Sequence, residues 1–216
     1  MGVLLRARRR LLVAPPAGLI AGVAETTNAA PNFSLNPLAL GAAVGDTMVV
    51  ASLWEDDSPV ATPGGWTNVT EVESPGHTVA RWHIDKVKFT GTPPSSVGWS
   101  YAGANGVAYA AAIMRGVTTV GALTNVQNNS DAPGTFPAFP VTAGSKGALV
   151  FVLADGVSED ASGVGNLTNM AAVVRDTTPV VARAAMVGFT TNSVSTSFNT
   201  GTMPLQRFQI GWLPLE

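Results

Sequence analysis

The sequence lacks cysteine altogether and contains only two histidines among its 216 residues. Without cysteine the chain forms no disulfide, holds no thiolate nucleophile and offers no cysteine ligand to zinc. Charged residues are also scarce at 12% of the chain, which is roughly half the usual share in soluble proteins. So little charge is easier to explain if neighbouring subunits cover part of the surface, although a secreted β-sandwich with a Thr/Ser/Asn surface fits the composition equally well.

Positive charge is concentrated at the N-terminus. Four of the 12 lysines and arginines lie within the first ten residues, which leaves eight basic residues against 14 acidic ones in the rest of the chain. This acidic remainder has no basic stripe with which to neutralise phosphates, so nucleic acid is not an expected partner.

The first 32 residues combine this charge with apolar residues. MGVLLRARRR is followed by LLVAPPAGLIAGVA, which resembles a signal peptide cleaved after Gly-Val-Ala. Pro15-Pro16 interrupts the apolar run, which is too short to span a bilayer, so membrane insertion is not expected. We predict that residues 1–32 form an extended assembly arm that binds another protein, with the signal peptide as the alternative. The expected contact residues of the arm are Leu4, Leu5, Arg6, Arg8, Arg9, Arg10, Leu11 and Leu12.

The rest of the chain has the pattern of an all-β protein. Short β-prone runs recur between Gly, Pro, Asn and Asp, and no long run has the capped, 3.6-residue periodicity of a helix. About twelve short strands at this spacing predict a sandwich or barrel. The Ala-rich run 108–114 is expected to be a buried strand, because small residues let two sheets approach closely. The predicted strands are Phe33–Leu40, Thr47–Trp54, Thr67–Glu73, Val79–Val87, Ser96–Tyr101, Ala108–Arg115, Val120–Val126, Ala148–Ala154, Thr168–Arg175, Val180–Thr190, Val194–Phe198 and Gln206–Leu213.

Three segments of the first half recur in the same order in the second half, at an offset of 101 or 102 residues. The paired segments are 45–53 with 146–154, 67–69 with 168–170, and 79–81 with 181–183. Such a repeat predicts two four-stranded halves, neither able to bury its apolar face alone, pressed face to face.

The resulting prediction is one jelly-roll-like β-sandwich domain over residues 33–216. Its pseudo-repeated halves are expected at about 33–126 and 141–216. The proline-containing segment 127–140 is predicted to be the crossover loop between them.

Four motifs of the first half appear in a fixed order: Gly45-Asp46 before an apolar strand, Pro63-Gly64-Gly65-Trp66-Thr67, Arg81-Trp82, and Arg115-Gly116-Val117 after the Ala-rich strand. In this order they resemble a β-sandwich domain common in phage tail, spike and head-appendage proteins. The resemblance covers about residues 41–155 well and the remainder loosely. It implies a virion module, and the motifs themselves look like fold determinants.

Catalytic chemistry finds little support in the residues. His77 follows Pro75-Gly76 and is expected in a turn, and His83 is expected on the surface of a strand. Neither has the base-and-orienter partners that nucleophilic catalysis requires, so we predict no catalytic residue, no enzyme activity and no cofactor. The acidic loops are expected to be solvated. Their only metal-ligating candidates, weak ones for calcium, are Asp56, Asp57 and Asp160.

Carbohydrate binding is the functional alternative, because sugar rings stack on exposed aromatic faces. Trp54 stands at a strand end beside an acidic loop, so it is the predicted glycan contact. Trp66 is expected in core or edge packing, and Trp82 and Trp99 are expected to be buried in strands.

Together these patterns predict a structural virion protein of a tailed bacteriophage or phage-like particle. It is expected to be a capsid decoration, head-spike or tail-appendage subunit, docked through its N-terminal arm on the particle exterior. The expected partners are other virion proteins and copies of itself. A carbohydrate-binding or host-receptor-binding module, possible also as a free secreted protein, is the alternative, with host surface polysaccharide as its ligand.

Overall fold

The protein is built from antiparallel β-sheets. The computed structural model describes residues 18–27, 32–54, 59–73, 81–100, 107–117, 120–121, 124–128, 134–139, 147–156, 164–165, 170–178, 181–190, 194–198 and 206–215. Within these ranges every regular element is a strand, and none is a helix, so the predicted all-β sandwich class is confirmed. The same ranges contain no helix that is long and apolar enough to span a bilayer.

The strands follow the predicted order closely. Those at 47–54 and 67–73 have the predicted bounds, and the Ala-rich run forms a strand that is buried along almost its whole length. The strands are β1 (Gly18–Thr27), β2 (Asn32–Leu35), β3 (Thr47–Trp54), β4 (Thr67–Glu73), β5 (Arg81–Lys88), β6 (Val97–Ser100), β7 (Val107–Arg115), β8 (Thr124–Asn128), β9 (Gly134–Phe139), β10 (Gly147–Gly156), β11 (Val164–Gly165), β12 (Met170–Thr178), β13 (Val181–Thr190), β14 (Val194–Phe198) and β15 (Gln206–Leu215).

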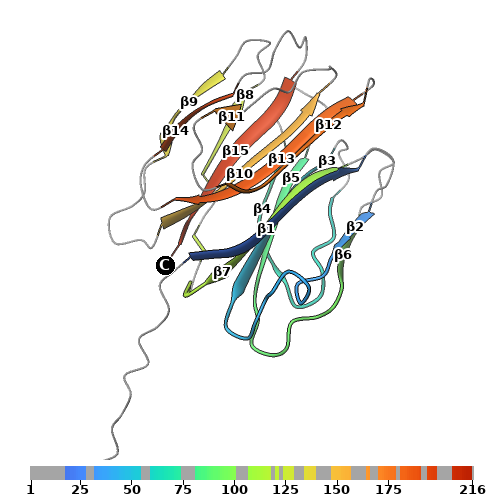
Figure 1. Ribbon diagram of the computed structural model, residues 1–216. Helices are drawn as coiled ribbons and strands as arrows, with labels where there is room; N and C mark the ends of the chain where they lie inside the picture. Colours follow the sequence, from blue (N-terminus) through green and yellow to red (C-terminus); the bar gives the residue numbers. More distant parts are fainter. Residues whose placement is uncertain are drawn as a thin grey trace, which may run out of the picture.

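Two five-stranded sheets form the body of the molecule (Figure 1). The first sheet has the order β1-β7-β3-β5-β4, and the second sheet has the order β8-β15-β10-β13-β12. The two sheets are connected in the same way, since β8, β15, β10, β13 and β12 take the places of β1, β7, β3, β5 and β4. Each has one strand more than the four predicted, because β1 and β8 add an edge strand to their sheets.

The smaller sheets follow the same scheme. β2 pairs with β6 in the first half, and β9 pairs with β14 in the second half, where β11 is added. The matching connectivity agrees with a duplicated unit, while the superposition of the two backbones and the jelly-roll description remain predictions.

The two large sheets pack on each other through a shared hydrophobic core. β1 and β7 of the first sheet contact β13 of the second, and β1 also contacts β12. Leu149, Phe151 and Val187 of the second sheet join side chains of the first sheet in one buried cluster. The members from strands of the first sheet are Val49, Ala51, Leu53, Trp82, Ile84, Ala108, Ala110, Ala112 and Met114. Alanines on β7 leave room for the second sheet, as predicted from their small size.

The outer face of the first sheet, which points away from the second sheet, is also buried. There β2 and β6 cover it and form a second cluster around Phe33, Trp54, Trp99 and Tyr109. In Figure 1 these two strands lie on the side of the first sheet that faces away from the second sheet. Because both faces are covered, β3 reads as a continuous buried run in place of the alternation of a half-exposed strand.

The N-terminal arm differs from its predicted bounds. Gly18–Thr27 form β1 and pair with β7 from Gly18↔Arg115 to Thr27↔Val107, so this part of the segment 1–32 belongs to the first sheet. Two of its apolar residues, Ala21 and Val23, pack against the outer cluster, whereas Ile20 stays exposed. The predicted contact residues from Leu4 to Leu12 lie outside the described residues.

The predicted crossover loop also differs. The proline pattern predicts a loop over residues 127–140, but Gln127 and Asn128 end β8 and Gly134–Phe139 form β9. The three prolines of this segment led to the loop prediction, and β9 accommodates Pro137 as a strand at the edge of its sheet.

The motifs Gly45-Asp46 and Arg115-Gly116 meet in the fold. Arg115 donates two hydrogen bonds to Asp46, from Nε to Oδ1 at 2.9 Å and from an Nη to Oδ2 at 2.8 Å. This bond to Arg115 holds the pKa of Asp46 below its ordinary value, although burial acts in the opposite direction. Gly45 and Gly116 adopt φ angles of 92° and 73°, which favour glycine. These motifs therefore fix the beginning of β3 beside the end of β7.

Close packing of the sheets predicts the effect of enlarging β7. Ala110 is fully buried in the core between the sheets, so Ala110→Leu is expected to lower the free energy of unfolding by about 1–3 kcal/mol through overpacking. The measurement is urea denaturation. Ala39→Leu, at an exposed turn position, is the control and is expected to change stability little. Equal stability of the two variants would contradict close packing at this alanine.

Candidate functional site

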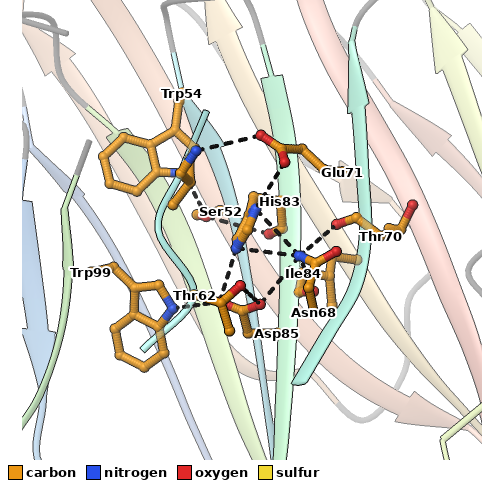
Figure 2. A network of polar contacts seen from close by, with 11 residues as sticks. Ser52, Trp54, Thr62, Asn68, Thr70, Glu71, His83, Ile84, Asp85 and Trp99 are labelled. Carbon is orange, nitrogen blue, oxygen red and sulfur yellow. Dashed lines mark hydrogen bonds and ion pairs between the residues drawn. The ribbon is translucent and has the colours of Figure 1, made fainter. Parts of the chain in front are cut away.

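The largest polar cluster among the described residues lies on the outer face of the first sheet (Figure 2). His83 and Asp85 are two residues apart on β5, so they point to the same face. Both are buried, with 2% and 0% of their surface exposed. The prediction of a surface histidine at position 83 is therefore wrong, because β6 and the chain before β4 cover this face.

Asp85 is the acceptor at the centre of the cluster. Its Oδ2 accepts hydrogen bonds from His83 Nε2 and Trp99 Nε1, both at 2.9 Å. Its Oδ1 accepts from Thr62 Oγ1 at 3.0 Å and Asn68 Nδ2 at 3.2 Å. An ionised carboxylate offers only acceptors, so His83 Nε2 must carry the hydrogen of this bond. Four donors from different segments satisfy one buried charge.

These donors determine the acidity of Asp85. Burial by itself raises the pKa of a carboxyl group, but the hydrogen bond and charge interaction with His83 oppose it, followed by the bonds from Trp99 and Thr62. The net effect is that the pKa of Asp85 is lowered from its ordinary value of 3.8. The carboxylate is thus the form that this site stabilises.

The other nitrogen of His83 faces a second carboxylate. Nδ1 of His83 lies 4.0 Å from Oε2 of Glu71, which is the cross-strand neighbour of His83 on β4. The other carboxylate oxygen of Glu71, Oε1, accepts a bond from the backbone N–H of Val60 at 3.4 Å. The imidazole is thus held between two carboxylates, with Asp85 much the closer.

Ser52 belongs to this cluster, but it is not placed as a nucleophile beside His83. Ser52 Oγ donates to the backbone carbonyl of His83 at 3.3 Å, and it accepts from Trp54 Nε1 at 2.7 Å. Nucleophile activation requires the hydroxyl to contact the imidazole itself. The ring nitrogens of His83 are instead directed at Asp85 and Glu71, which gives a hydrogen-bonded network suited to fixing strands.

Aromatic side chains surround the polar cluster and correct one prediction. Phe33 forms stacked pairs with Trp99 and Tyr109, with ring centroids 5.0 Å and 3.9 Å away. Trp54 is fully buried beside Phe33, so its face is not available to a sugar and the predicted glycan contact is wrong. Trp66 is partly buried and meets Trp99 edge-on, which confirms its expected role in packing, and the predicted burial of Trp82 and Trp99 is confirmed.

The remaining predicted site residues are not placed. His77, Asp56, Asp57 and Asp160 lie outside the described residues. Within the described ranges, no group of three or more histidine and acidic side chains is arranged to hold a metal ion.

Sequence reasoning missed the network around Asp85, although one signal for part of it was present. The spacing His-x-Asp on a strand places both side chains on one face, and that face is buried. Asn68 could not be found in this way, because a bulge between Asn68 and Thr70 brings it opposite Asp85.

Comparisons of the chain with protein-family models, with curated proteins and with solved structures find no match.

Two buried tryptophans offer a matched test of the network. Trp99 donates to Asp85, whereas Nε1 of Trp82, within the described part of the chain, has no hydrogen-bond partner. Both substitutions to phenylalanine remove a similar side-chain volume. Trp99→Phe also breaks a hydrogen bond to a charged group, which is worth about 1.5–3 kcal/mol. Trp82→Phe removes a donor that has no partner to lose. We expect Trp99→Phe to be less stable than Trp82→Phe by about 2 kcal/mol or more in urea denaturation. The reverse order would argue against the Asp85 network as a source of stability.

The lowered pKa of Asp85 predicts acid sensitivity. A carboxyl group with a lowered folded-state pKa contributes stability that is fully present above its unfolded-state pKa and is lost as pH falls through the folded-state pKa. Asp85→Asn is expected to cost about 3–5 kcal/mol at pH 7, since it leaves buried donors without their charged acceptor. The variant should also lose less stability than the wild type between about pH 5 and pH 2. Denaturation curves at several pH values measure both effects, and parallel pH profiles would contradict the role of Asp85.

Proposed function

We propose that the chain is a structural subunit of a bacteriophage-type virion, docked to the particle through its N-terminal segment. The observation that carries the proposal is the pairing of β1 with β7 over the length of the strand. Residues that precede Gly18 thereby lead directly into an edge strand of the first sheet. An anchor in residues 1–17 is therefore coupled to the buried core through the β1–β7 ladder, which is interrupted only by a register shift between Leu19 and Ala21.

The motif resemblance adds support. Gly45-Asp46 and Arg115-Gly116 are two of the four motifs that resemble those of phage appendage domains, and they form one ion pair that joins β3 to β7. β7 is also the strand to which β1 pairs. The motifs and the proposed docking segment thus meet on the same strand.

The Asp85 network supports a structural role in a different way. Its histidine, carboxylates, serine and indoles bond to groups of the same chain, and His83, Asp85 and Ser52 are buried. Such internally satisfied groups stabilise a single arrangement of strands.

The composition of the docking segment fits a protein partner. Leu4, Leu5, Leu11 and Leu12 each contribute about 1.5–3 kcal/mol when fully buried, which offsets the entropy of ordering the segment. The four arginines that lie between these leucines form charge-assisted hydrogen bonds with carboxylates. The acidic body of a neighbouring copy, or another virion protein, supplies the carboxylates. The docked subunit lies on the outside of the particle.

The position of β1 also weighs against the signal peptide. Cleavage after Ala24 would remove Gly18–Ala24, seven of the ten residues of β1, from its pairing with β7. An assembly segment that ends before Gly18 keeps this strand intact.

Truncation at two points tests the proposal. Deletion of residues 2–17 is expected to leave a folded β-protein with a thermal melt close to that of the full chain, but to abolish incorporation into particles. Deletion of residues 2–27 also removes β1. The outer cluster then loses the packing of Ala21 and Val23, and β12 and β13 lose the strand that they contact. This deletion is therefore expected to lower the melting temperature clearly.

Incorporation is measured by co-sedimentation with particles assembled from the other virion proteins. Normal incorporation of the 2–17 deletion would rule out the N-terminal segment as the anchor. Mass spectrometry of the particle-bound protein provides a second check, since a mature chain that begins near Glu25 would restore the signal-peptide interpretation.

A further inference from the structure

One end of the first sheet carries an unusual concentration of positive charge for this acidic chain. On β5 the side chains of Trp82 and Ile84 enter the core between the sheets. By strand alternation Lys86 and Lys88 continue along that same face. On this face of β5, two apolar side chains are therefore followed by two lysines at the end of the strand.

Neighbouring strands place hydroxyl groups beside these lysines. Thr67 of β4 is the cross-strand partner of Lys86, and Thr47 of β3 is the partner of Lys88. Partners directly opposite each other share a face of the sheet. Thr67 is exposed, while Thr47 is buried and donates to the carbonyl of Val117 at 3.3 Å.

These groups line a concave pocket of about 300 Å³. Its lining residues are Thr47, Gly65, Thr67, Lys86, Val87, Lys88 and Val120. Lys86 is held in place by a hydrogen bond from Nζ to the carbonyl of Val120 at 2.9 Å. Gly65 has a φ of 82° and has no neighbouring atom within 4 Å of the position a Cβ would occupy, so its backbone forms an open part of the wall.

No acidic side chain neutralises this pocket within the described residues. The ion pairs there join His83 to Glu71 and Asp85, and Arg115 to Asp46, and none includes a lysine. Asp85 separates Ile84 from Lys86 in the sequence and points to the opposite face of the sheet, where its bonds to Trp99 and His83 hold it. The carboxylate of Asp46, which precedes Thr47, is engaged by Arg115.

We propose that this pocket binds an acidic sugar, with the sugar carboxylate between Lys86 and Lys88. Ammonium groups form strong, charge-assisted hydrogen bonds with a carboxylate. The hydroxyl of Thr67 and the exposed backbone at Gly65 match the neutral hydroxyl groups of a sugar ring, and the volume admits a ligand of this size but not a large one. The inference adds a binding role to the structural role proposed above and does not depend on it.

Titration with glucuronate, glucose and inorganic sulfate tests the proposal on the full-length protein. Chemical shifts of the backbone amides, followed by NMR, report the position of binding. Glucuronate is expected to shift the amides of residues 65–67 and 86–88 in a saturable manner and to bind more weakly at high salt, whereas glucose has little effect. Sulfate is expected to bind more weakly than glucuronate, because it has no sugar hydroxyl groups to contact Thr67 and Gly65.

Lys88 provides the matched variants, because its side chain is exposed and the bond to Val120 is made by Lys86. Lys88→Gln is expected to weaken glucuronate binding about tenfold, the loss of one charge-assisted hydrogen bond. Lys88→Arg keeps the charge and is expected to retain most of the affinity. Both variants should keep the thermal melt and the particle incorporation of the wild type, so failure of the pocket is distinguished from failure of the assembly role.

Three results would overturn the proposal. They are no saturable shift with glucuronate, equal affinity for sulfate and glucuronate, and unchanged glucuronate affinity in Lys88→Gln. Equal affinity would show a simple anion site without recognition of the sugar.

Discussion

The central strands β3 and β7 of the first sheet are buried on both faces, and most features of the molecule follow from this constraint. The inner face of this sheet packs on the second sheet, and its outer face packs under β2 and β6. A strand such as β3 therefore has no solvent-facing side on which to place polar groups. Any polar side chain on these strands must find its partners inside the protein, because an unpaired buried donor or acceptor is costly.

Asp85 shows how this requirement is met. Its carboxylate lies on a covered face and takes donors from β5 itself, β4, β6 and the segment before β4. A buried charge with so many partners does not guarantee a large net stability, since desolvation opposes the attraction. The Asp85 carboxylate does hold these segments in one arrangement, because a shift of any one of them removes a hydrogen-bond donor from the ionised group.

The two proposed roles use different strands at the same end of the first sheet. β1, which follows the proposed docking segment, is one edge strand, and β4, which contributes Thr67 to the lysine pocket, is the other. β7, β3 and β5 lie between them and are tied together by the Asp46–Arg115 pair and the Asp85 network. Leu19 of β1 and Lys88 of β5 are aligned across the sheet through Met114 and Thr47. An anchor that precedes β1 and a ligand in the lysine pocket would therefore lie at the same end of the strands.

The sequence by itself determined the all-β class, most strand positions and the burial of the Ala-rich strand. These features depend on local residue patterns, such as alternation, turn residues and side-chain size, which act over a few neighbours. The shared order of strands in the two large sheets also agrees with the repeat seen at an offset of about 100 residues.

Only the tertiary structure decided which faces are covered, and the errors follow from that. His83 and Trp54 sit on strands whose patterns are compatible with exposure, but β2, β6 and the chain before β4 bury them. Gly18–Thr27 follow the charged and apolar N-terminal run that predicted an arm, and they form β1 because β7 offers its edge and β12 and β13 provide a surface. The convergence on Asp85 and the meeting of Lys86 with Thr67 likewise depend on pairing between distant strands, which no local pattern specifies.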